Sequence, residues 1–104
     1  MNLILNEKTL KKIREEIKDT RSTLSDFIAE IIFKWRDECR LSKIPKFKKE
    51  LQTTINISPW PGEIGSIKEI QYKYYKKFKE RLTYWQMIEA AWAWHCFKKE
   101  KKDG

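Results

Sequence analysis

The first forty residues divide into a short strand and two helices, and this order limits what the chain can fold into. The strand is predicted at residues 2–5, the first helix from about 7 to 19, and the second from about 24 to 40. A strand this short has unpaired backbone groups on both edges, so it needs a partner. If no other strand of the chain supplies one, a second copy of the protein must.

Apolar spacing defines both helices. The first has Leu10, Ile13 and Ile17 on one face, and Asn6 is a suitable N-cap because its side-chain oxygen can accept from a free amide. The second has a wide stripe made of Leu24, Phe27, Ile28, Ile31, Ile32 and Trp35. The polar residues 19–23 favour a break, and Thr23-x-x-Asp26 resembles a capping box. One continuous helix is the alternative.

In element order, lengths and turn composition, residues 2–38 resemble the ribbon-helix-helix DNA-binding proteins, the Arc/MetJ-type repressors and antitoxins. The resemblance implies an intertwined homodimer whose two strands pair in the major groove of DNA. Leu3 and Leu5 would then face the core, while Asn2 and Ile4 would face DNA. The start of the second helix would hold a phosphate through Ser22, Thr23 and Ser25, with a further charged contact from Arg21.

A plain helical hairpin with a frayed N-terminus explains the same residues. Ile4 cannot form a hydrogen bond with a base edge and can only contact a thymine methyl group. No glycine marks the turn between the two helices.

Residues 42–65 form a linker of different character. Its segment 52–57 is either a strand or an extended arm, and residues 58–62 must form a loop because they contain two prolines. Trp60 either docks this loop onto the helices or binds a partner. If the segment is a strand, it can pair with residues 2–5 inside one chain, and the requirement for a dimer then fails.

Residues 66–104 are predicted to form a helical hairpin. Ser66-x-x-Glu69 has the form of a capping box, and an apolar face follows through Ile67, Ile70, Tyr74, Phe78 and Leu82. The remaining faces carry tyrosines among the basic residues Lys68, Lys73, Lys76, Lys77, Lys79 and Arg81. Such a mixture can stack on bases and neutralise phosphates. An amphipathic helix whose lysines are solvated and whose tyrosines line the edge of the core has the same pattern and is the favoured interpretation.

The last helix, predicted from residue 84 to about 99, is apolar nearly all round. Such a helix is buried on all sides, which in a small chain indicates an interface with a second subunit or a partner protein. The interface candidates are Trp60, Trp85, Trp92 and Trp94. Glu89, the acid within this helix, is expected to pair with a lysine or to lie at the edge.

Composition narrows the function further. The net charge of +8 suits an anionic partner, and no apolar run is long enough to cross a bilayer. Cys39 and Cys96 lie far apart without a recognisable secretory signal, which favours reduced thiols and a cytoplasmic protein. Because no enzymatic or metal-binding motif is present, we expect no catalysis, no metal and no cofactor.

The sequence therefore predicts a mainly α protein with three segments. Residues 1–41 form a ribbon-helix-helix-like unit, residues 42–65 a linker, and residues 66–104 a helical hairpin. The leading hypothesis is a dimeric DNA-binding protein: a transcriptional repressor, an antitoxin, or a plasmid or phage accessory factor. The alternative is a non-enzymatic protein–protein interaction module, such as a phage-encoded inhibitor or assembly factor that docks through its last helix. RNA binding is a weaker alternative.

Overall fold

The structure is a computed structural model that describes residues 1–38 and 42–103, with side chains described as far as residue 100. In chain order its elements are β1 (Asn2–Asn6), α1 (Glu7–Ile17), α2 (Leu24–Glu38), β2 (Gln52–Asn56), α3 (Glu63–Phe78) and α4 (Tyr84–Asp103). The protein is thus mainly helical with one short strand pair, as its sequence predicts.

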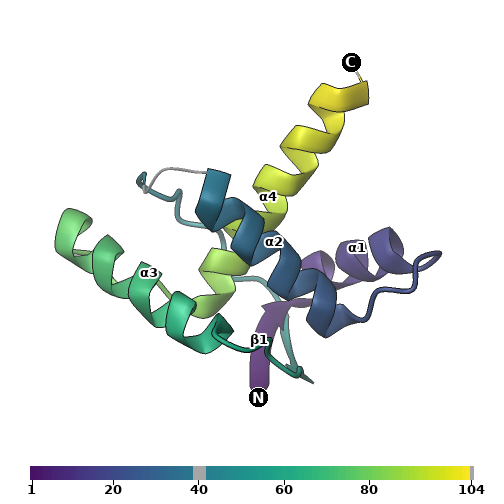
Figure 1. The fold of residues 1–104 in the computed structure, drawn as a ribbon, viewed down its shortest axis with the longest axis horizontal. Coiled ribbons are helices and arrows are strands. Elements are labelled where there is room, and N and C mark those ends of the chain that lie inside the picture. Colours follow the sequence, from purple (N-terminus) through teal and green to yellow (C-terminus); the bar gives the residue numbers. More distant parts are fainter. Residues whose placement is uncertain (39–41, 104) are drawn as a thin grey trace.

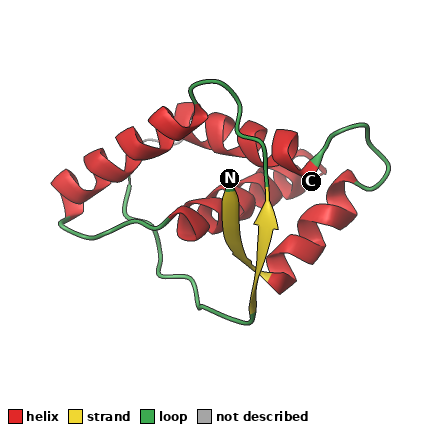
Figure 2. Cartoon of the chain, turned by 90° about the horizontal axis from the view of Figure 1, so that it is seen from below, coloured by secondary structure: helices red, strands yellow, loops and turns green. Residues whose placement is uncertain are grey.

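The partner of β1 is β2 of the same chain. The two strands pair antiparallel, with Leu3 opposite Ile55 and Leu5 opposite Thr53, and they lie side by side in Figure 2. Residues 52–56 therefore form the strand that the sequence left open. Because the chain supplies both strands, β1 does not require a second copy of the protein.

One hydrophobic core joins the three predicted segments. α2 crosses α4 at the centre of the molecule, with α1 and α3 on opposite sides (Figure 1). Residues of β1, α1, α2 and α4 contribute the most deeply buried apolar side chains: Leu5, Ile13, Ile28, Ile31, Ile32, Met87 and Ile88. Burying each one stabilises the fold by about 1.5–3 kcal/mol. The linker adds Ile44 and Ile57 to this core.

A polar turn separates α1 from α2, as predicted. α1 ends at Ile17, earlier than the predicted residue 19, because the Thr20 hydroxyl donates to the Ile17 carbonyl at 2.8 Å. α2 then begins at Leu24, where Thr23 Oγ1 accepts the backbone amide of Asp26 at 3.1 Å. The predicted end of this helix at residue 40 lies outside the described residues.

The predicted start of α3 at Ser66 is wrong. The helix begins at Glu63, directly after Gly62, whose φ of +81° is a left-handed conformation that glycine adopts without steric cost. The Glu63 carboxylate accepts the backbone amide of Trp60 at 3.1 Å, which fixes the turn before the helix. The Ser66 hydroxyl instead accepts from the Arg36 guanidinium at 2.9 Å.

The predicted extent of the hairpin helices is also corrected. α3 ends at Phe78, because Lys79 has a φ of +58° and its amide bonds to the Tyr75 carbonyl at 2.8 Å. Leu82 is still buried, but it reaches the core from the following turn. α4 begins at Tyr84 as predicted and continues to Asp103, past the predicted end near residue 99.

Candidate nucleic-acid interface

The two strands form a ribbon that extends past their assigned ends. Backbone bonds of 2.9 Å join Ile57 to Met1 at one end and Glu7 to Leu51 at the other. The N-terminal ammonium donates to Asn56 Oδ1 at 3.1 Å and to the Ile57 carbonyl at 3.0 Å. These contacts extend the pairing of the two segments to residues 1 and 57.

The outward face of the ribbon consists of four exposed side chains from two cross-strand pairs. Asn2 lies opposite Asn56 and Ile4 lies opposite Thr54, so each pair projects from the same face. Ile4 is 51% exposed although it is apolar. The sequence identified Asn2 and Ile4 as candidates for this face but missed Thr54 and Asn56, because the alternation in residues 52–57 indicates a strand without naming its partner.

Asn6 connects the ribbon to the core; it occupies the predicted N-cap position of α1, but the predicted side-chain capping bond is wrong. Its side chain forms no capping bond to α1. It donates instead to the Lys48 carbonyl and to Glu89 Oε1, both at 3.2 Å, and it accepts from the Glu50 amide at 3.2 Å and from Gln52 Nε2 at 3.1 Å. The bonds to Lys48, Glu50 and Gln52 fix β2 and the segment that leads into it, and the bond to Glu89 joins them to α4.

Glu89 is the buried carboxylate at the centre of this network. Besides the Asn6 contact, its Oε1 accepts the Thr9 hydroxyl at 2.6 Å. The expected lysine partner, or a position at the edge, is wrong: the carboxylate is buried and held by neutral donors. A buried polar group without such partners would cost stability, so Asn6 and Thr9 are the reason this helix tolerates an acid.

The start of α2 lies next to one end of the ribbon. Ser25 Oγ accepts the Ser58 amide at 2.8 Å, shortly after Asn56. Arg21, Ser22 and Thr23 are exposed in the turn that precedes the helix. The phosphate site predicted here stays a prediction, and the Asp26 carboxylate in the first turn opposes an anion at the same helix end.

The Asp26 side chain forms a hydrogen bond with the linker loop. Its Oδ1 accepts the indole N–H of Trp60 at 2.8 Å, and the Trp60 ring stacks on Phe33 with 6.1 Å between ring centroids. The Arg36 guanidinium lies 4.7 Å from the centre of the Phe33 ring. Trp60 thus docks the loop onto α2 within one chain, which is the first of the two alternatives for this residue.

The basic patch predicted on α3 lies on the surface. The side chains of Lys68, Lys73, Lys76, Lys77, Lys79 and Arg81 are all exposed. Two tyrosines accompany them: Tyr72 is 61% exposed and Tyr75 is 55% exposed. Tyr74 is the tyrosine of this helix that belongs to the core, where its hydroxyl accepts the Ile44 amide at 3.0 Å.

The tryptophans predicted at a partner interface already make contacts within the chain. Trp85 and Trp92 pack against the core. The ammonium group of Lys98 lies 5.0 Å from the centre of the Trp94 ring, and the same lysine forms an ion pair with Glu38. Phe97, in the C-terminal half of α4, is 60% exposed. The C-terminal end of α4 projects from the body (Figure 1). Whether these residues also bind a partner stays a prediction.

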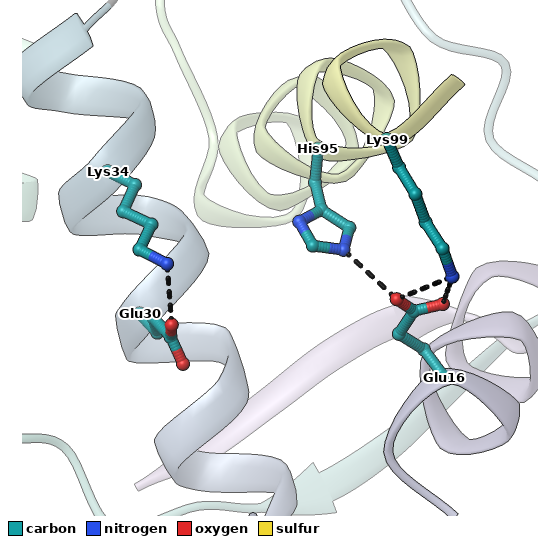
Figure 3. A network of polar contacts seen from close by, with 5 residues as sticks. All are labelled: Glu16, Glu30, Lys34, His95 and Lys99. Atoms are coloured by element: carbon teal, nitrogen blue, oxygen red, sulfur yellow. Dashed lines mark hydrogen bonds and ion pairs between the residues drawn. The ribbon is translucent and has the colours of Figure 1, made fainter. Parts of the chain in front are cut away.

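A polar cluster ties the outer half of α4 to α1. Lys99 Nζ lies 3.0 and 2.9 Å from the two carboxylate oxygens of Glu16, and His95 Nε2 lies 3.3 Å from one of them (Figure 3). The hydrogen bond from Lys99, followed by that from His95, lowers the pKa of Glu16. Among the described residues, no group of three or more His, Cys, Asp or Glu side chains is arranged to hold a metal ion.

Two further groups have shifted pKa values. Burial, together with the hydrogen bond to the Glu63 carboxylate, raises the pKa of Tyr84. Glu63 is fully buried and also caps the turn before α3, a role that sequence reasoning missed. Burial raises the pKa of the Cys96 thiol, which makes it a poor nucleophile. The other cysteine, Cys39, lies outside the described residues.

A cleft of about 780 Å³ opens between α2, α3, α4 and the linker. Its apolar lining includes Trp35, Phe47 and Ile70. Of the charged groups around it, Lys73 is paired with Glu69 at 2.8 Å and Lys43 with Glu80 at 3.1 Å. This pairing leaves the cleft less suited to an anion than the outer face of α3.

Within the part of the chain that the structure describes, none of the helices combines the length and apolarity that crossing a membrane requires. Comparisons of the chain with protein-family models, with curated proteins and with solved structures give no match.

Proposed function

We propose that the protein binds duplex DNA by placing its β1–β2 ribbon in the major groove. The observation that carries this proposal is the exposed outward face of a two-stranded antiparallel ribbon, formed by Asn2, Ile4, Thr54 and Asn56. The major groove of B-DNA is wide enough for such a ribbon. A positive net charge of +8 supports the same polyanionic ligand.

The four side chains supply the chemistry that base edges require. An asparagine amide can form two hydrogen bonds with adenine, and a threonine hydroxyl can bond to several base edges. Asn2 and Asn56 are direct cross-strand neighbours, so they lie at the same level of the groove. Ile4 can contact a thymine methyl group, which gives its exposed apolar side chain a partner.

Phosphate contacts would orient the ribbon on the duplex. The N-terminal ammonium lies at the end of the ribbon that carries Asn2 and Asn56. Arg21 and the hydroxyl groups of Ser22 and Thr23 are exposed in the turn before α2, which adjoins the same end through the Ser25–Ser58 bond. These groups are the candidates for backbone contacts.

The ribbon-helix-helix resemblance implies a homodimer in which two chains share one ribbon, but here both strands come from one chain. One chain completes one ribbon, so two copies would bring two ribbons to the DNA rather than share one. Light-scattering mass of the protein, alone and with a duplex, gives the number of copies. The roles of transcriptional repressor, antitoxin or plasmid or phage accessory factor, and a cytoplasmic location, stay predictions.

The test is fluorescence anisotropy of a labelled mixed-sequence duplex, titrated with the protein at low and high salt. We expect binding whose affinity falls steeply with salt because phosphate contacts release counterions. Thr54→Glu places a carboxylate on the outward face and should weaken duplex binding at least about tenfold, the scale of one lost base contact. Circular dichroism checks that the variant folds.

The matched control is Ser42→Glu, which makes the same change in charge at an exposed linker position outside the ribbon. It should reduce affinity far less than Thr54→Glu. No duplex binding at low salt would refute the proposal of DNA binding. Equal losses in the two variants would refute the role of the ribbon while leaving non-specific binding in place.

A second candidate function is protein–protein interaction through the projecting half of α4. The observation that favours it is the 60% exposure of Phe97, which lies in the C-terminal half of this helix. An interface of this kind is held by burial of aromatic side chains, so the complex should survive high salt. Loss of such a complex on Phe97→Glu, with duplex binding unchanged, would support this function.

A further inference from the structure

The outer face of α3 combines aromatic and basic side chains in helical register. Lys68, Tyr72 and Lys76 follow one another at steps of four residues, and Tyr75 lies three residues after Tyr72. Lys79 follows directly after the end of the helix and is exposed. Residues three or four apart are neighbours on a helix surface. The Lys76 ammonium lies 5.3 Å from the centre of the Tyr72 ring, which places charge and ring together.

The core does not need these tyrosines. α3 packs inward through Ile67, Ile70 and Tyr74, and Phe78 adjoins Tyr74 with 4.7 Å between ring centroids. Tyr72 and Tyr75 instead present more than half of their surface to solvent. Their exposure removes the interpretation in which these tyrosines only line the edge of the core.

Acidic side chains offset little of the positive charge on this surface. Glu63 is fully buried in the core side of the helix. Glu69 is paired with Lys73 at 2.8 Å, and Glu80 is paired with Lys43 of the linker at 3.1 Å. The exposed face therefore keeps an excess of lysine charge beside the two tyrosines, which suits a polyanion with flat apolar groups.

We propose that this face binds single-stranded nucleic acid, with Lys68, Lys76 and Lys79 on phosphates and Tyr72 and Tyr75 stacked on bases. Base faces are covered in a duplex but accessible in a single strand, so the tyrosines select the single-stranded form. The site goes beyond the ribbon and does not depend on it. A membrane surface fits less well, because the apolar side of α3 is already buried in the core.

The test measures binding of the full chain to labelled oligonucleotides by fluorescence anisotropy. The probes are a 12-nucleotide oligo-dT, the corresponding oligo-rU, and an abasic deoxyribose-phosphate chain of equal length. Wild-type protein should bind both base-containing probes at least about tenfold more tightly than the abasic chain, because stacking requires bases. The ratio of the oligo-dT and oligo-rU affinities shows whether the site prefers single-stranded DNA or single-stranded RNA.

The variants separate stacking from charge. Tyr72→Ala/Tyr75→Ala should lose the preference for bases, whereas Tyr72→Phe/Tyr75→Phe should keep it because the rings remain. Lys68→Ala/Lys76→Ala should weaken binding to all three probes and reduce its salt dependence. All four altered side chains are exposed, and circular dichroism verifies folding.

The ribbon variant Thr54→Glu tests whether the α3 site and the ribbon site bind independently. Thr54→Glu should leave oligo-dT affinity unchanged while it weakens duplex binding, so either proposal can fail alone. Equal affinity of the wild type for oligo-dT and for the abasic chain would overturn the stacking site. Tighter binding to anionic lipid vesicles or to polyglutamate than to oligo-dT would overturn single-stranded nucleic acid as its ligand.

Discussion

Replacing Asn6 with alanine should destabilise the protein more than any change on the outward face of the ribbon. The Asn6 side chain makes four hydrogen bonds that join β1, α4 and the segment before β2. Alanine removes all four and leaves the buried Glu89 carboxylate with Thr9 as its remaining partner in the network. The Lys48 carbonyl and the Glu50 amide lose their bonds to the same side chain.

The magnitude follows from the burial of each bond. The contact with the Glu89 carboxylate is buried, and a hydrogen bond to a charged group contributes about 1.5–3 kcal/mol. The bonds to Lys48 and Glu50 are partly buried and contribute about 0.5–1.5 kcal/mol each, reduced where water replaces the lost partner. The side-chain amide of Gln52 can bond to water instead, so the loss of its bond to Asn6 adds little to the cost. The expected loss in the free energy of unfolding is therefore about 3 kcal/mol.

Urea denaturation followed by tryptophan fluorescence measures this loss, and Asn2→Ala is the matched control. Asn2 is an exposed asparagine of the same strand, so its replacement should change stability by less than about 0.5 kcal/mol. Hydrogen exchange should also show faster exchange of β2 amides in Asn6→Ala. If the two variants unfold at the same urea concentration, the network does not hold β2 in place and the reasoning is wrong.

Three further predictions concern other parts of the fold. Gly62→Ala should cost about 1 kcal/mol in the free energy of unfolding, because the added Cβ meets no atom within 4 Å and strain arises from the left-handed backbone alone. Tyr84→Phe removes a donor from the fully buried Glu63 and should cost about 2 kcal/mol in the same urea assay. The lowered pKa of Glu16 means that its contact with Lys99 stabilises the fold above the ordinary value of 4.5 and is lost as the pH falls below it. Glu16→Gln should therefore cost about 0.5 kcal/mol at pH 7 and nothing near pH 2, as followed by thermal unfolding across pH; an equal cost at both would contradict the assignment.

The approximate positions of α1, α2 and α3 were predictable because each has an apolar face that repeats at helical spacing. The stripe from Leu24 to Trp35 predicted α2, and the threonine before it predicted the start of that helix. The partner of β1 was not predictable in the same way. Alternation along a strand defines its two faces, but the choice between another segment and a second chain depends on the fold as a whole.

The errors arise where a distant residue overrides a local preference. Asparagine is a favoured N-cap, yet Asn6 turns to Glu89, which lies 83 positions away in the sequence. Ser66 and Glu69 have the spacing of a capping box, but Gly62 and the buried Glu63 start α3 one turn earlier. In both cases a hydrogen bond to a buried carboxylate is formed in place of the capping bond that the local sequence favours.

The candidate site was predictable in part for the same reasons. The outward position of Asn2 and Ile4 follows from alternation with the buried Leu3 and Leu5. Thr54 and Asn56 join them only through the pairing with β2. On α3 the pattern favours tyrosines at the edge of the core over tyrosines that stack on bases, and the structure shows Tyr72 and Tyr75 more than half exposed.

The most direct test of the account is a map of backbone amide shifts in ¹H–¹⁵N spectra of the protein as a mixed-sequence duplex is added at low salt. The largest changes in amide shift should occur in the ribbon, at residues 2–5 and 53–57, and in the turn 21–25. The amide shifts of α4 should change little. The changes should be smaller in Thr54→Glu. An unchanged ribbon in the presence of saturating duplex, or changes confined to α3, would contradict the claim that β1 and β2 contact DNA.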